Sequence, residues 1–146
     1  MSYGLGAYKK TSVGTASKEQ ILLMLYQAAI KNCKKAVEAI DQKQIAKKGE
    51  YIGKLQDIII ELNNSLDHEI GGDVAKELTS LYDYMLHATT QANLKIDKAP
   101  LESVLKILNT LYEGWTEAIK SLKKESDAAA ATATGVASKA GPENRG

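Results

Sequence analysis

The 146-residue sequence is poor in several residue types that often mark a function. It contains one cysteine, two histidines, two prolines, one tryptophan and no phenylalanine. Cys33 alone cannot form an internal disulfide, and its place on an apolar helical face predicts a small buried side chain. The sequence also lacks a phosphate-cradling glycine loop and a nucleophile paired with a base at helical spacing. It therefore argues against an enzyme and against a bound cofactor.

The best candidate for a metal site in the sequence is the run Asp67-His68-Glu69, with Asp73 nearby. These residues flank Gly71-Gly72, so we interpret them as solvated loop and helix-cap residues and expect no metal site. His87 is expected to be a surface or boundary side chain of the third predicted helix. The paired lysines at 9–10, 34–35, 47–48 and 123–124 are interpreted as solvated helix faces and ends.

The sequence also lacks an excess of positive or negative charge. The 19 basic and 18 acidic side chains give a net charge of +1 and are interspersed along the chain. No basic footprint for nucleic acid or anionic lipid results, so neither is expected as a partner. The longest apolar run, residues 21–26, is too short to cross a bilayer, and no signal-peptide pattern precedes it. We expect a cytoplasmic protein without direct membrane insertion.

Apolar residues recur every three or four positions between Ser17 and Lys124, which is typical of amphipathic helices. Ser17 and Gln20 have the spacing of a capping box, so a first helix is predicted from there to about Asp41. A second stripe has steps of seven, three, four, three and four residues. Its members are Ile45, Ile52, Leu55, Ile59, Leu62 and Leu66.

Residues 68–72 end in two glycines, which predict a helix stop, and Asp73 is the expected cap of a third helix. Pro100 suits the first position of a fourth helix. The inner face of the third helix is predicted to hold Val74, Leu78, Leu81, Tyr82, Met85, Ala88 and Ala92. That of the fourth is predicted to hold Leu101, Val104, Leu105, Leu108, Leu111, Tyr112, Trp115, Ile119 and Leu122.

Four such helices joined by short loops predict an all-α fold, an antiparallel up-down-up-down four-helix bundle. We expect a flexible N-terminal segment over residues 1–16 and the bundle itself over residues 17–125. Residues 126–146 are low in complexity and lack large apolar side chains, so they are expected to be disordered.

The helices carry more large apolar residues than a bundle core needs. A bundle helix uses about three positions in seven for its core, yet residues 21–26 point in every direction around the first helix. The other surplus residues are Tyr51, Ile58, Ile60, Tyr84, Leu86 and Ile107. They either widen the core, scatter singly over the surface, or form a groove for an amphipathic helix or an extended apolar peptide. Together they favour the groove.

Six segments, in order, carry a resemblance to a known family over nearly all of residues 5–120. They are "AYKKTSV", "TASKEQILLMLYQAAI", "KKGEYIGKLQDIIIELNNSLD", "GGDVAKELTSLYDYML", "QANLKID" and a fourth helix ending near "EGW". With these segments the sequence resembles the FliS family of flagellar export chaperones, which bind flagellin.

The resemblance implies a bundle that holds the disordered C-terminal segment of new flagellin in the cytoplasm and prevents early polymerisation. It also implies delivery to the cytoplasmic domain of the flagellar export-gate membrane protein, without ATP or catalytic residues. By the same resemblance, the segment with Tyr8 and Val13 covers part of the groove until the client displaces it. Tyr8 is then the residue expected to contact the export gate.

We place the flagellin groove on the second, third and fourth helices. The expected groove residues are Tyr51, Leu55, Ile58, Ile59, Leu62, Leu78, Leu81, Tyr82, Met85, Asn93 and Asp97. Two departures from the family pattern bear on polar contacts: Gln27-Ala28 replaces Asp-Gly, and residues 86–89 lack the usual arginine pair. The alternative hypothesis is a helical-bundle adaptor or regulator that binds another amphipathic helix.

Overall fold

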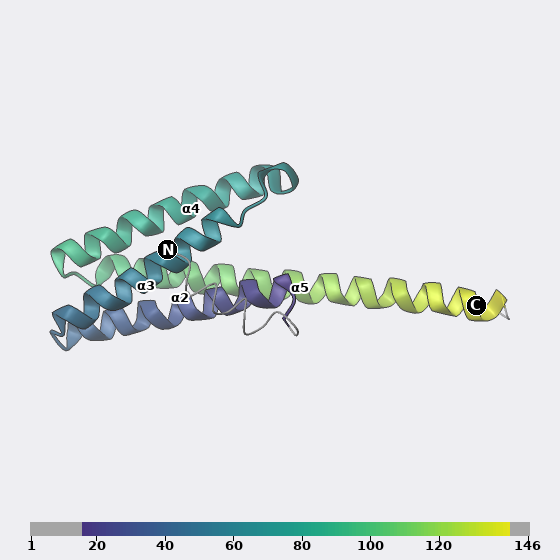
Figure 1. The fold of residues 1–146 in the computed structure, drawn as a ribbon, viewed down its shortest axis with the longest axis horizontal. Coiled ribbons are helices and arrows are strands. Elements are labelled where there is room, and N and C mark those ends of the chain that lie inside the picture. Colours follow the sequence, from purple (N-terminus) through teal and green to yellow (C-terminus); the bar gives the residue numbers. More distant parts are fainter. Residues whose placement is uncertain (1–15, 141–146) are drawn as a thin grey trace. The chain divides into compact units, whose positions relative to one another are not determined.

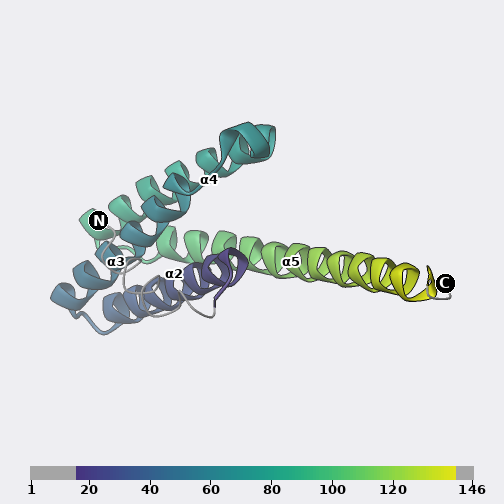
Figure 2. The ribbon, with the colours of Figure 1, turned by 45° about the vertical axis from the view of Figure 1, so that its right-hand side comes forward.

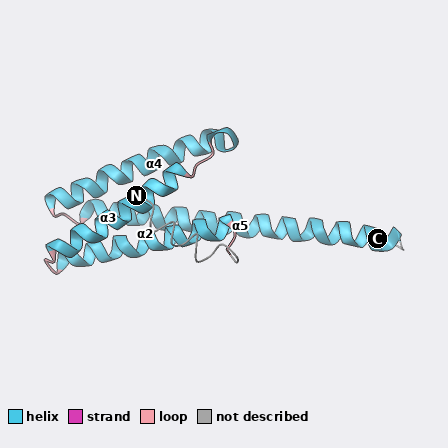
Figure 3. Ribbon diagram, in the orientation of Figure 1, coloured by secondary structure: helices cyan, strands magenta, loops and turns pink. Residues whose placement is uncertain are grey.

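Helices joined by short loops make up almost all of the chain that this computed structural model describes (Figures 1 and 3). The structure describes residues 16–140, and of residues 133–140 only the backbone. Within that range it contains no strand. The elements in chain order are α2 (Lys18–Asp41), α3 (Ile45–Asn64), α4 (His68–Lys95) and α5 (Ala99–Ala140).

The chain divides into two compact units, residues 1–112 and residues 113–146. The first contains α2, α3, α4 and the start of α5, and the second contains the rest of α5. These units do not coincide with the predicted segments 1–16, 17–125 and 126–146, whose boundaries stay a prediction. Each unit is described separately below.

A capping box starts α2, as predicted. The Gln20 amide nitrogen donates to Ser17 Oγ over 3.1 Å, and the Ser17 amide nitrogen donates to Gln20 Oε1 over 3.2 Å. Both bonds satisfy amide groups that lack a partner inside the helix. The helix then buries small residues, Ala29, Cys33 and Ala36 among them, which allow close packing along α3.

The start of α4 differs from the prediction. Asp67, and not Asp73, caps the helix, since its Oδ1 accepts from the amides of Glu69 and Ile70 over 3.1 Å each. The predicted stop at the glycines is a kink inside the helix: Gly72 has φ 50° and ψ −122°. Glycine adopts such a positive φ without a Cβ clash, so the backbone bends there and the helix resumes.

Side-chain contacts show that the helices of the first unit run in alternating directions. Gln27 of α2 bonds to Tyr112 of α5, and Cys33, further along α2, bonds to the carbonyl of Leu101, which is earlier in α5. The two helices are therefore antiparallel. Tyr84 of α4 contacts Ser103 of α5 over 3.2 Å. The packing of α3 between α2 and α4 completes the bundle (Figure 2). The predicted all-α up-down-up-down four-helix bundle is confirmed.

The core of the first unit follows one stripe on each helix. On α4 the stripe begins at Ala75, which is 2% exposed, and continues through Leu78, Tyr82 and Met85. Val74 was predicted to face inward and is 59% exposed, because the small Ala75 holds the inner position at the start of the stripe. Ile45 was also placed on a core stripe and is 49% exposed, at the first residue of α3.

The second unit is helical as far as it is described. The sequence predicted disorder from residue 126, whereas α5 continues to Ala140. Alanine has the highest helix propensity of all residues, so this alanine-rich stretch favours a helix without packing. Side chains 120–132 are all exposed. Leu122, predicted to face inward, is 60% exposed. Residues 141–146 lie outside the described residues.

Candidate functional site

Six of the eleven predicted groove residues lie in the bundle core. None of them is more than 6% exposed, so in this structure they stabilise the fold and do not form a surface. They are Leu55, Ile59 and Leu62 on α3, and Leu78, Tyr82 and Met85 on α4. The Tyr82 hydroxyl bonds to the Tyr26 hydroxyl of α2 over 2.5 Å, which satisfies its polar group in the core.

The other five predicted groove residues reach the surface to different extents. Tyr51, Ile58, Leu81 and Asn93 are partly buried, and Asp97 is exposed. Asp97 has a structural contact, since its Oδ1 accepts from the Ala99 amide over 3.0 Å at the start of α5. Binding by any of the eleven stays a prediction. Tyr8 and Val13, predicted to cover the groove, lie outside the described residues.

Lys48 is a buried cation that the sequence did not reveal. Its pair with Lys47 suggested a solvated face, yet it is only 5% exposed, and this interpretation was wrong. The Lys48 ammonium donates to the Asn93 carbonyl oxygen over 3.0 Å. Carbonyls in the last turn of α4 lack intrahelical partners and carry partial negative charge, so a cation from α3 is favourable there. Asn93 is thus held at the end of α4.

Large apolar side chains are exposed at several places on the first unit. Two of the surplus residues are among them, Ile60 at 36% and Tyr84 at 47%, whereas Leu86 and Ile107 are partly buried. The sequence did not single out Ile70 (87%), Leu94 (74%) or Ile96 (49%) as exposed. The helical stripe alone gives no signal for them, because they lie at the two ends of α4, where the kink and the cap change the backbone direction.

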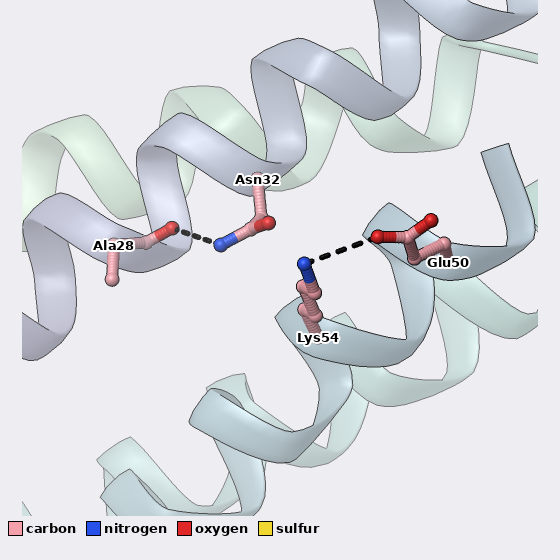
Figure 4. A network of polar contacts seen from close by, with 4 residues as sticks. All are labelled: Ala28, Asn32, Glu50 and Lys54. Carbon is pink, nitrogen blue, oxygen red and sulfur yellow. Dashed lines mark hydrogen bonds and ion pairs between the residues drawn. The ribbon is translucent and has the colours of Figure 1, made fainter. Parts of the chain in front are cut away.

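A cleft of about 380 Å³ lies between α2 and α3. Its lining residues are Met24, Gln27, Ala28, Lys31, Asn32, Lys35, Tyr51 and Lys54. Figure 4 shows part of it: Asn32 of α2 and Lys54 of α3 point into the space between the two helices. The ammonium groups of Lys35 and Lys54 lie 5.5 and 5.9 Å from the centre of the Tyr51 ring, a cation–π arrangement.

Reactive groups in the described part of the chain are few, and its one cysteine is buried. No group of three or more histidine, cysteine, aspartate or glutamate residues among residues 16–140 lies close enough together to hold a metal ion. Burial raises the pKa of the Cys33 thiol to about 12. Burial, and then the adjacent Tyr26 phenol, raises the pKa of Tyr82 above its usual value. Within the described range, no helix is both long enough and apolar enough to span a membrane.

The fold and the site define a helical-bundle protein with exposed apolar side chains and a lysine-lined cleft. A family model described as "Flagellar protein FliS" matches residues 1–122 of this chain. The chain therefore belongs to the FliS family.

Individual relatives agree with the family match. The flagellar secretion chaperone FliS of Vibrio cholerae is 41% identical over 121 residues, which are 80% of this chain and 89% of that protein. The flagellar secretion chaperone FliS of Bacillus subtilis is 34% identical over 119 residues, 82% of this chain and 88% of that protein. A crystal structure described as a flagellar chaperone from bacteria shares the fold, with a TM-score of 0.68, 19% identity and coverage of 82% of this chain and 97% of that one.

Proposed function

We propose that this protein binds the C-terminal segment of flagellin in the cytoplasm and keeps it from polymerising before export. It then delivers the segment to the cytoplasmic domain of the flagellar export-gate membrane protein. The observation that carries the proposal is the family match over residues 1–122, together with relatives that are flagellar secretion chaperones. The chemistry is binding alone, which agrees with the scarcity of reactive groups.

Accessible apolar residues supply the physical basis for client binding. Tyr51, Ile58 and Leu81 are partly buried and belong to the predicted groove, and Tyr84 on α4 is 47% exposed. Full burial of such a side chain contributes about 1.5 to 3 kcal/mol, of which these residues have realised only a part. A few of them under one client segment supply enough free energy for micromolar binding after the cost of ordering that segment.

The six core residues then have a different role from the accessible ones. Leu55, Ile59 and Tyr82 are at most 1% exposed, so a client cannot touch them while the bundle keeps this packing. We assign them to the floor that holds the accessible residues in place. Tyr8 and Val13 are proposed as the removable cover of the groove, and Tyr8 as the later contact with the export gate.

Calorimetry with a peptide from the flagellin C-terminus tests the proposal. We expect micromolar binding, and a loss of about tenfold, or 1.4 kcal/mol, for Ile58→Ser or Leu81→Ser. Ile70→Ser is the matched control, because Ile70 is an exposed apolar residue of α4 outside the predicted groove. The unfolding free energy is measured for all variants.

Two results would count against this function. Absence of binding at micromolar concentration would favour the alternative, an adaptor for another amphipathic helix. Equal weakening by Ile70→Ser and Ile58→Ser would show that the apolar contacts are unspecific. Deleting residues 1–14 tests the cover separately: a competing cover predicts tighter flagellin binding, and a segment that contributes contacts predicts weaker binding.

A further inference from the structure

The cleft between α2 and α3 carries positive charge that is only partly balanced by nearby acidic groups. Three lysines line it, and we call it the cationic cleft. Lys54 pairs with Glu50 over 3.2 Å (Figure 4). Within residues 16–140, neither Lys31 nor Lys35 has an ion-pair partner. Two ammonium groups that share one concave surface repel each other, so an anion between them is favourable.

Each side-chain amide of the cleft already donates one hydrogen bond within the protein. Asn32 Nδ2 donates to the Ala28 carbonyl over 2.8 Å, and Gln27 Nε2 donates to the Tyr112 hydroxyl over 2.7 Å. The lysines supply the charged donors for a ligand. Met24 and the Tyr51 ring add apolar surface beside them. The cleft thus suits a ligand that combines carboxylates with apolar groups, which is the chemistry of an acidic peptide.

The spacing of the lysines also fits a polypeptide. Lys31 and Lys35 are four residues apart on one helix, which places their Cα atoms about 6 Å apart along the axis. Alternate side chains of an extended chain are about 6.6 Å apart and point the same way. Two acidic residues separated by one other residue therefore match the two lysines.

The N-terminal segment of this chain does not fit the cleft as a ligand, and the cleft is separate from the predicted flagellin groove. Residues 1–15 contain Lys9 and Lys10 and no acidic residue, so they would add repulsion. The proposed groove lies on α3, α4 and α5, whereas α2 supplies six of the eight residues that line the cleft. Only Tyr51 belongs to both surfaces.

We propose that the cationic cleft binds an acidic segment of a second protein partner, at a site distinct from the flagellin groove. The segment places two carboxylates on Lys31 and Lys35 and an apolar side chain against Met24 and the Tyr51 ring. Because the cleft is open to solvent, this binding weakens as salt rises.

The test uses a rhodamine-labelled (Glu-Ala)4 peptide as the probe and fluorescence anisotropy as the readout. We expect saturable binding that the double variant Lys31→Glu, Lys35→Glu weakens at least about tenfold. The double variant Lys34→Glu, Lys47→Glu has the same net charge and changes two exposed lysines outside the cleft, so it keeps most of the affinity. The neutral pair Lys31→Gln, Lys35→Gln is expected to lie between them, and a (Gln-Ala)4 peptide to bind weakly.

Several outcomes would overturn the cleft as a partner site. Equal losses in the two charge-reversed variants would show binding to the general field of the protein. Displacement of the probe by an equal concentration of inorganic phosphate would assign the cleft to small anions. Self-association that the cleft variant abolishes would assign it to acidic residues of a second copy. Displacement by the flagellin C-terminal peptide would merge it with the client groove, whereas failure of flagellin to bind at all would contradict the proposed function alone.

Discussion

Cys33 shows how the fold changes the chemistry of a single residue. Its side chain is fully buried, and its Sγ donates to the Leu101 carbonyl oxygen over 3.2 Å. Burial raises the pKa of this thiol from 9.0 to about 12, because a thiolate has no water or cation to stabilise it there. The predicted role as a small buried residue is confirmed, and the thiol is protected from reagents that need a thiolate.

This pKa shift predicts a loss of stability in alkaline solution. Above pH 9 the unfolded chain releases the thiol proton while the folded chain keeps it, so the unfolded state is favoured as pH rises to about 12. The contribution of Cys33 to the unfolding free energy should fall by about 1.4 kcal/mol per pH unit in this window. Urea unfolding at pH 8, 9 and 10 measures it. Cys33→Ala should show a shallower decline, and equal slopes in both proteins would contradict the assignment.

Single residues also show why the sequence could not divide core from surface. Ile58 and Ile59 are neighbours of the same type, yet Ile59 is fully buried and Ile58 is not. Tyr82 lies in the core and Tyr84 is 47% exposed, although both are tyrosines of α4. A three-four periodicity identifies the apolar side of a helix, but the exposed edge of that side depends on how closely the neighbouring helices approach.

At the scale of elements, the start of a helix was predictable where the sequence offers one capping signal, and was not predictable where two signals compete. Ser17 and Gln20 satisfy each other three residues apart, so the sequence alone defined the start of α2. At α4, both Asp67 and Asp73 are good caps, and the glycines between them fit either a stop or a kink. In the structure Asp67 forms the cap and Gly72 forms the kink, while residues 67–70 are exposed, so the apolar pattern gives no signal for this choice.

Ile96 ends α4 with a backbone conformation that is unfavourable for its residue type. It has φ 51° and ψ 50°, a left-handed conformation that a β-branched side chain rarely adopts. This conformation costs about 1 to 2 kcal/mol in an L-residue, whereas asparagine tolerates it. Ile96→Asn should therefore raise the unfolding free energy by about 1 kcal/mol, measured by urea unfolding.

Ile45→Asn is the matched control for Ile96. Both isoleucines are 49% exposed, but Ile45 lies in ordinary helical backbone at the start of α3. Asparagine there gains nothing from strain relief, so no stabilisation is expected. If the two variants changed stability equally, the left-handed backbone at Ile96 would not store strain.

At the scale of the whole molecule, the cationic cleft is a property of two helices and not of any motif. Lys34-Lys35 was interpreted as a solvated face, and Lys34 is indeed exposed, while its neighbour Lys35 borders the cleft. Lys54 lies on the same helix as Tyr51, and the packing of α2 along α3 brings Lys35 to the same ring. The bundle was predictable from four periodic segments, but which of their polar residues face one another was not.

The C-terminal extension of α5 should be dispensable for the stability of the rest of the chain. Side chains 127–132 are all exposed, and the family match ends at residue 122. A chain that ends at Ser126 should keep its urea midpoint and its affinity for the flagellin peptide, while its helical circular dichroism decreases. Leu108→Ala is the positive control: Leu108 is fully buried, so this change should cost about 2 to 5 kcal/mol. A truncated chain destabilised by more than about 1 kcal/mol would show that the extension supports the fold, because changes at exposed sites usually stay within about 0.5 kcal/mol.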